Sequence, residues 1–133
     1  MANEEQLSIL KQGVEVWNKW RKENPDVEIN LARANLNGAN LESINLQNAD
    51  LRIAYLRRAH LNNADLNNAN LKDSDLSEAN LMGASLTDAN LDLVNLSRAI
   101  LSETRLAAAN LRGANLIGSV FLMHIWLRQA LKT

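Results

Sequence analysis

The chain of 133 residues has no cysteine, one proline, five glycines, one phenylalanine and one tyrosine. Without cysteine, the fold has neither disulfide bonds nor thiolate metal ligands. No apolar run approaches the roughly 18 residues that a membrane-spanning helix needs. The first ten residues also lack the basic and apolar regions of a secretory signal. We therefore expect a cytoplasmic protein that has no membrane partner.

The chain also lacks an excess of either charge, with fourteen Lys and Arg against fifteen Asp and Glu. Proteins that bind the phosphate backbone normally carry a basic excess, so we expect no nucleic-acid partner. The only two histidines, His60 and His124, lie far apart in the sequence. No glycine-rich phosphate loop and no metal-ligand spacing occurs. The sequence thus predicts a protein that is not an enzyme and that holds no cofactor or metal.

What the sequence does contain is leucine at every fifth position. Eighteen leucines follow one another without a gap from Leu31 to Leu116, and Phe121 continues the series. A small residue, most often alanine, lies two positions before each leucine, with Ile44 and Val94 as larger exceptions. The position directly before the leucine is usually Asn or Asp.

A five-residue period fits neither a helix nor a flat strand. Successive leucines would lie about 140° apart around a helix axis, and on a strand they would alternate between the two faces. All of them point inward only if the chain turns by about a quarter circle per repeat, so that four repeats close one square coil. Such coils stack about 4.8 Å apart through parallel backbone hydrogen bonds. Leucine then stacks on leucine, and the narrower second inward position takes alanine.

The stretches ADLNNANLKDSDLSEANL and ANLRGANL resemble the pentapeptide repeat family, whose pattern is A(D/N)LXX. The resemblance covers about nineteen repeats over residues 29–123. It implies an all-β solenoid, a right-handed quadrilateral β-helix of slightly under five coils. The family is abundant in cyanobacteria, and most of its members have no known activity.

An open stack of coils exposes strand edges and leucine side chains, so we expect a cap at each end. Residues 1–28 form the N-terminal cap, with one helix over residues 3–23 that starts at an Asn3/Gln6 capping box and ends before Pro25. Its apolar half contacts the first coil, and Gly13 lets it approach closely. The capping residues of this helix are Leu10, Val14, Trp17 and Trp20. For the two tryptophans, stacking against a ligand is the alternative role.

Residues 124–133 are expected to form a short amphipathic C-terminal helix that carries Trp126 on its apolar face. This helix either closes the last coil or pairs with its twin in a homodimer. Some members of the resembled family dimerise through this end, which the resemblance permits here. A membrane-surface role is disfavoured because the polar face carries only two basic residues, Arg128 and Lys132.

Two outward surfaces are candidate sites for an unidentified protein partner. Three arginines on adjacent faces, Arg52, Arg57 and Arg58, are candidates for docking an acidic partner, with a solvated mixed surface as the alternative. On another face, exposed apolar residues gather towards the C-terminal end, which is typical of an interface. Alternatively, the C-terminal helix folds back over them. These residues are Met82, Ile100, Val120 and Leu122.

The sequence therefore favours a non-enzymatic protein-interaction module. One branch of the resembled family binds DNA gyrase by imitating duplex DNA, but such mimicry needs a continuous acidic track, which this near-neutral chain lacks. A second alternative is that the repeats act as a spacer within a longer protein.

Overall fold

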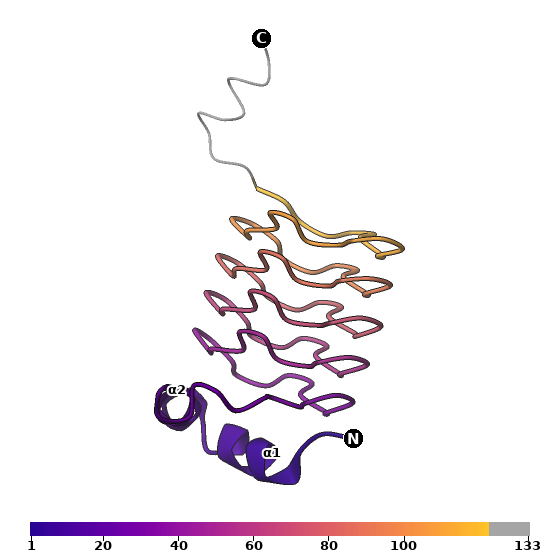
Figure 1. The fold of residues 1–133 in the computed structure, drawn as a ribbon. Helices are drawn as coiled ribbons and strands as arrows, with labels where there is room; N and C mark the ends of the chain where they lie inside the picture. Colours follow the sequence, from indigo (N-terminus) through magenta and orange to yellow (C-terminus); the bar gives the residue numbers. More distant parts are fainter. Residues whose placement is uncertain (123–133) are drawn as a thin grey trace.

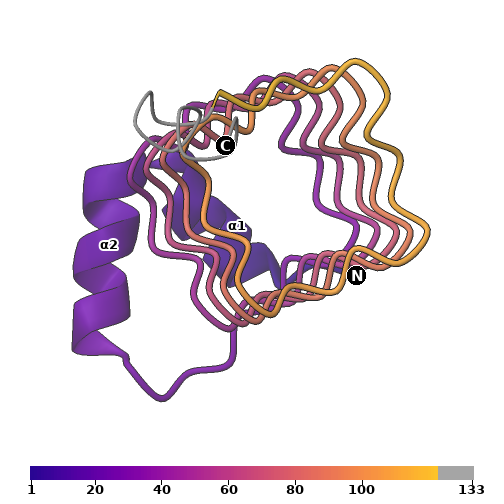
Figure 2. The same cartoon turned by 90° about the horizontal axis from the view of Figure 1, so that it is seen from above.

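The computed structural model describes residues 1–122, which form a square solenoid with two helices at its N-terminal end (Figure 1). Helix α1 spans Glu4–Lys11 and helix α2 spans Val14–Glu23. Seen along its axis, the solenoid is a quadrilateral whose coils lie almost in register, with α1 beneath the coils and α2 alongside one side (Figure 2). The expected C-terminal helix over residues 124–133, with Trp126, lies outside the described residues.

The coils are joined by four columns of parallel backbone bridges, one column on each face. Each bridge joins residues twenty apart in the chain, as in Asn30 to Asp50, and each column passes through the residue before a leucine. Because four five-residue repeats make one coil, the square coil expected from the leucine period is confirmed, and with it the right-handed quadrilateral β-helix that the family resemblance implies. The first column starts at Asn30 and the last bridge joins Ile100 to Val120.

The core is the stack of inward leucines and alanines. The inward leucines of the five-residue series from Leu31 to Leu101 are at most 5% exposed, and most are completely buried. Each repeat turns where the N–H of the small residue donates to the C=O of the preceding leucine, as from Ala34 to Leu31 at 3.1 Å. The residue just before the small one has a φ near +60°, as in a type II turn. Glycine fills this turn position at Gly38, where no strain arises.

The Asn or Asp before each leucine shapes the next turn. Its side-chain oxygen accepts a hydrogen bond from the main-chain N–H two residues later, as in Asn30 to Ala32 and Asp75 to Ser77. This contact explains why short polar residues recur at a position whose backbone belongs to the bridge column.

The N-terminal cap differs from the sequence-based expectation in one respect: the single helix predicted over residues 3–23 is wrong. The chain breaks at Gly13, whose φ of 109° and ψ of 164° lie outside the helical region. Gly13 therefore ends α1 and starts α2, instead of allowing one helix to approach the coil. The capping box is also only half formed, because Asn3 accepts from the N–H of Gln6 but the Gln6 side chain bonds elsewhere.

Candidate interaction surfaces

The cap closes one part of the first coil by means of a glutamine side chain. The amide of Gln6 donates to the C=O of Glu28 and accepts from the N–H of Asn30, both at 2.8 Å. The main-chain N–H of Asn3 donates to the C=O of Asn30 at 2.8 Å. These bonds replace those that a preceding coil would make, so the buried Gln6 acts as a substitute strand.

Helix α2 closes the edge at Asn45 in the same way. The amide of Asn18 accepts from the N–H of Asn45 at 2.8 Å and donates to the C=O of Ser43 at 3.1 Å. The indole of Trp17 donates to the C=O of Asn45 at 2.7 Å. Arg21 adds a bond to the C=O of Gln47 at 2.9 Å, and burial lowers the pKa of its guanidinium.

The four expected capping residues lie against the core to different degrees. Trp17 is completely buried and Leu10 is 5% exposed. Val14 and Trp20 are partly buried and pack on the same cluster, and the rings of Trp17 and Trp20 lie 5.3 Å apart. Trp17 therefore combines an apolar lid with a hydrogen bond to the strand edge, which leaves its indole nitrogen no free donor for a ligand.

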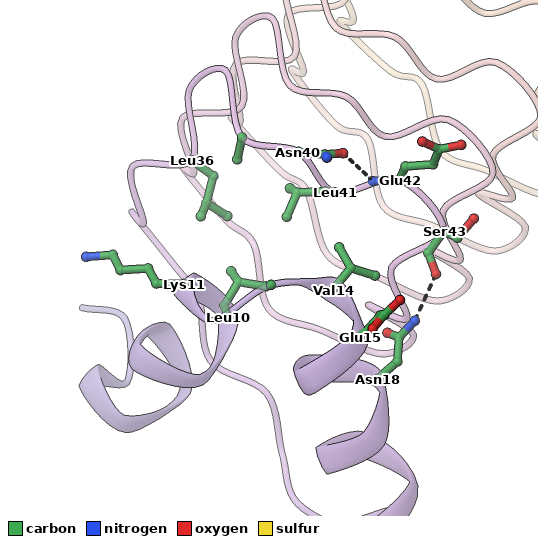
Figure 3. Close-up of a pocket in the computed structure, with 12 residues that line it drawn as sticks. Leu10, Lys11, Val14, Glu15, Asn18, Leu36, Asn40, Leu41, Glu42 and Ser43 are labelled. Atoms are coloured by element: carbon green, nitrogen blue, oxygen red, sulfur yellow. Dashed lines mark hydrogen bonds between the residues drawn. The ribbon is translucent and has the colours of Figure 1, made fainter.

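A groove remains between the helices and the other part of the first coil (Figure 3). It has a volume of about 730 Å³. The first coil contributes residues 36 and 39–43 to its wall, and the cap contributes residues 10–11, 13–15 and 18. The helices close the edge at Asn30 and Asn45, whereas the groove runs past the edge at Asn40.

Two of the three expected docking arginines come together. Arg57 and Arg58 both bind the carboxylate of Glu78, at 3.1 and 3.0 Å, and Arg98 lies 3.5 Å from it on the same face. Hydrogen bonds from Arg58 and then Arg57 hold the pKa of Glu78 below its usual range. Three arginines around one carboxylate leave this surface with a net positive charge.

Arg52 does not join that cluster. It forms a two-pronged hydrogen bond with Asp50, at 2.9 and 2.7 Å, and this contact lowers the pKa of Asp50. Two coils further on, Lys72 and Arg112 flank the nearly buried carboxylate of Asp92, at 3.9 and 3.3 Å. These basic residues thus pair with acidic ones in their own coil or in a neighbouring coil.

The apolar residues expected at the C-terminal end lie along one face of the solenoid. Ile100 and Val120 bridge directly and are 36% and 42% exposed. On the same face, Met82 lies nearer the N-terminal end and is 44% exposed, and Leu122 lies at the C-terminal end and is 55% exposed. Phe121 occupies a core position yet is 51% exposed, because no further coil covers it among the described residues. We call these five residues, Met82, Ile100, Val120, Phe121 and Leu122, the apolar strip.

Residues 1–122 offer no group of His, Asp and Glu side chains arranged to hold a metal. In the same part of the chain, both helices are too short to cross a lipid bilayer.

Sequence reasoning missed that three polar residues of the cap close the first coil: Gln6, which was expected only in a capping box, and Asn18 and Arg21. The sequence did hold a signal for Asn18 and Arg21. These two residues follow Trp17 and lie three positions apart, so they share one side of a helix that was expected to contact the first coil. A polar residue on the contact side of a cap is typical of a group that bonds a strand edge.

Comparison with known proteins agrees with the architecture. The family model for pentapeptide repeats matches eight copies over residues 27–52, 49–88 and 89–121. The pentapeptide repeat protein Rfr23 from the cyanobacterium Cyanothece 51142 is 38% identical, with a TM-score of 0.70, over 71% of this chain and 65% of its own. A pentapeptide repeat protein from the Arabidopsis thaliana thylakoid lumen is 29% identical, with a TM-score of 0.67, over 77% and 73% of the two chains.

HetL, a pentapeptide repeat protein involved in heterocyst differentiation regulation in Nostoc sp. PCC 7120, is 32% identical with a TM-score of 0.52. The match covers 72% of this chain and 52% of HetL, so the chain spans about two thirds of Rfr23 and half of HetL. No curated protein sequence matches the chain. The family match covers well over half of the chain, and the leucine columns, turns and four-sided coils agree with it: the chain belongs to the pentapeptide repeat family.

Proposed function

We propose that this protein is a non-enzymatic interaction module whose apolar strip binds a protein partner, and that this partner is a second copy of the same chain. The observation that supports the proposal is the exposure of the apolar strip. Its residues are between 36% and 55% exposed, whereas the inward leucines of the middle coils are buried. Clustered exposed apolar side chains are typical of protein interfaces.

A second copy suits this surface because of its place in the fold. The strip reaches the end of the stack opposite to the helical cap, where Phe121 exposes an aromatic ring at a core position. Two such ends can meet around a two-fold axis, which places the same apolar surface on both sides of the contact. The strip itself carries no charged side chain that would have to lose its water, so burying it is favourable.

The arginine cluster is the weaker candidate surface. Its three guanidinium groups already share the carboxylate of Glu78, and exposed ion pairs of this kind exchange readily with solvent and salt. An acidic partner would have to compete with Glu78 for the same donors. The arginine cluster can add specificity for a partner that binds mainly at another surface, but we do not propose it as the main binding site.

Light scattering coupled to size-exclusion chromatography tests the proposal over a range of protein concentrations. We expect the full chain to show twice its monomer mass of 14.8 kDa and to dissociate on dilution. Leu122→Asp should abolish the dimer, because it places a carboxylate within the apolar contact. Leu93→Asp is the matched control: Leu93 is 53% exposed, close to the 55% of Leu122, but lies outside the strip.

A chain that stays monomeric up to its solubility limit contradicts association with a second copy. Equal loss of the dimer in both variants would show that apolar surface in general, and not the strip, holds the copies together. Circular dichroism of the two variants verifies that the solenoid remains folded.

A further inference from the structure

The first coil has a strand edge that the cap closes on only two of its four faces. In every later coil, the residue before the leucine bonds the preceding coil through both its N–H and its C=O. His60 shows the pattern: its N–H donates to Ala39 and its C=O accepts from Leu41. In the first coil, the cap supplies such partners at Asn30 and Asn45. Within residues 1–122, the main-chain N–H and C=O of Asn40 have no protein partner.

This open edge lies inside the groove and not on a flat surface. Asn40, Leu41 and Glu42 form one wall, and Leu10 and Val14 on the cap form the other (Figure 3). Val14 and Ala39 are partly exposed there, so the groove presents an aliphatic floor beside unpaired polar backbone. Its volume of about 730 Å³ falls within the usual range for ligand sites. An extended peptide is the ligand that satisfies both features, because it offers main-chain donors and acceptors at strand spacing.

The charges along the groove give it a direction. Lys11 lies at the Leu36 end, and Glu15 lies at the end next to Asn18 and Ser43 (Figure 3). Glu42 projects near that second end. All three side chains are exposed, and none forms an ion pair with another residue of the described chain.

We propose that this groove binds an extended peptide segment of another protein, which pairs as a parallel strand with the main chain of Asn40 and Glu42. The segment runs in the direction of the first coil, since every bridge of the solenoid is parallel. It carries an acidic residue near its start, beside Lys11, and a basic residue near its end, beside Glu15. The side chain between them is small or aliphatic, to fit against Val14 and Ala39. This site is independent of the apolar strip.

A displayed library of random heptapeptides, selected on the immobilised full chain, provides the probe. We expect enriched peptides to share an acidic residue on the N-terminal side of an aliphatic one and a basic residue on its C-terminal side. In titrations of the isotope-labelled protein, an enriched synthetic peptide should shift the backbone amides of Asn40 to Ser43. Methylating the one peptide nitrogen that donates to Asn40 should weaken binding about tenfold or more, which corresponds to about 1.4 kcal/mol.

Charge reversal tests the direction of the bound strand. Lys11→Glu combined with Glu15→Lys leaves the aliphatic floor intact and should select peptides with the opposite order of charges. The matched control is Lys19→Glu combined with Glu23→Lys. This exposed pair lies one turn apart on α2, its ion pair survives the swap, and neither residue lines the groove. The control should leave the original preference unchanged.

Three results would overturn the proposal: a library from which no peptide is enriched, enriched peptides that bind the charge-reversed chain as well as the original, or binding that main-chain methylation leaves unaltered at every position. Thermal unfolding of each variant confirms that loss of binding does not reflect loss of the cap.

Discussion

The two ends of the solenoid have similar repeat sequences but different surroundings. At the N-terminal end, Leu36 and Leu41 are 5% and 3% exposed, because α1 and α2 pack beneath the first coil. At the other end, Leu106, Leu111 and Leu116 are only partly buried and Phe121 is half exposed. The same leucine pattern thus produces a closed core in one place and an apolar surface in another.

This difference shows that burial in a repeat protein depends on the neighbouring coil more than on the repeat itself. Each coil contacts only the coils before and after it, so inward side chains that nothing else among residues 1–122 covers stay exposed. The N-terminal cap solves a second problem as well, since Gln6 and Asn18 supply the hydrogen bonds of a missing strand. We place the proposed association at the end where residues 1–122 show no such device.

The largest expected effect contrasts a leucine in the middle of the stack with one at its end. Leu71→Ala removes a completely buried side chain and should lower the free energy of unfolding by about 2–5 kcal/mol. Leu116→Ala, at a partly buried position, should cost less than about half as much, because the cavity opens to solvent. Urea unfolding of the monomeric Leu122→Asp background measures both; equal losses would contradict the difference between middle and end.

The second prediction removes part of the closure at the capped N-terminal end. Gln6→Met keeps the apolar volume but leaves the N–H of Asn30 and the C=O of Glu28 without partners, at a cost of about 1–3 kcal/mol. Gln12→Met changes an exposed glutamine on the same segment and should cost less than about 0.5 kcal/mol. Amide hydrogen exchange at Asn30 should accelerate in the first variant only. A stable Gln6→Met protein with unchanged exchange would mean that the glutamine is not a strand substitute.

The third contrast involves two serines at the same inward repeat position. Ser74 is 2% exposed, and its hydroxyl has no hydrogen-bond partner among the described residues. Ser74→Ala should therefore stabilise the protein by about 1 kcal/mol. The hydroxyl of Ser119, in the last described coil, donates to the C=O of Leu116 at 2.8 Å, so Ser119→Ala should destabilise slightly. If Ser74→Ala and Ser119→Ala shift the unfolding midpoint in the same direction, the two hydroxyls do not differ in hydrogen bonding as described.

The smallest effect belongs to the charged face between the two ends. Arg58 and Arg57 lower the pKa of Glu78 in the folded protein. The ion pairs of Glu78 therefore stabilise the fold fully at pH values above the pKa of glutamate in the unfolded chain, about 4.3. That contribution is lost as the pH falls through the lower folded pKa. A carboxyl titration followed by NMR should give Glu78 a midpoint below about 4.3, and 1 M salt should move it back towards that value. A midpoint at or above 4.3 in low salt would show that the arginines do not hold the carboxylate.

The repeat pattern was sufficient to predict the solenoid, because an unbroken five-residue leucine period has one geometry that buries every leucine. The cap was harder, since Gly13 can either allow close packing or break a helix, and only the tertiary contacts decide. Met82, Ile100 and Leu122 could be placed on one face, because residues twenty apart stack on each other: Met82 and Leu122 share one column, and Ile100 lies two residues from it. The same count puts Glu78 beside Arg58, but it does not say which nearby arginines bind the carboxylate, because the side-chain conformation of an exposed arginine is set by competition with solvent.

Hydrogen exchange of the full chain at several protein concentrations tests the asymmetry of the two ends most directly. We predict that amides of residues 106–122 exchange more slowly as the concentration rises, because a second copy covers that end. Amides of the capped first coil, at Asn30 and Asn45, should exchange at the same rate throughout. Exchange that is independent of concentration at residues 106–122, or protection that grows equally at both ends, would contradict the account.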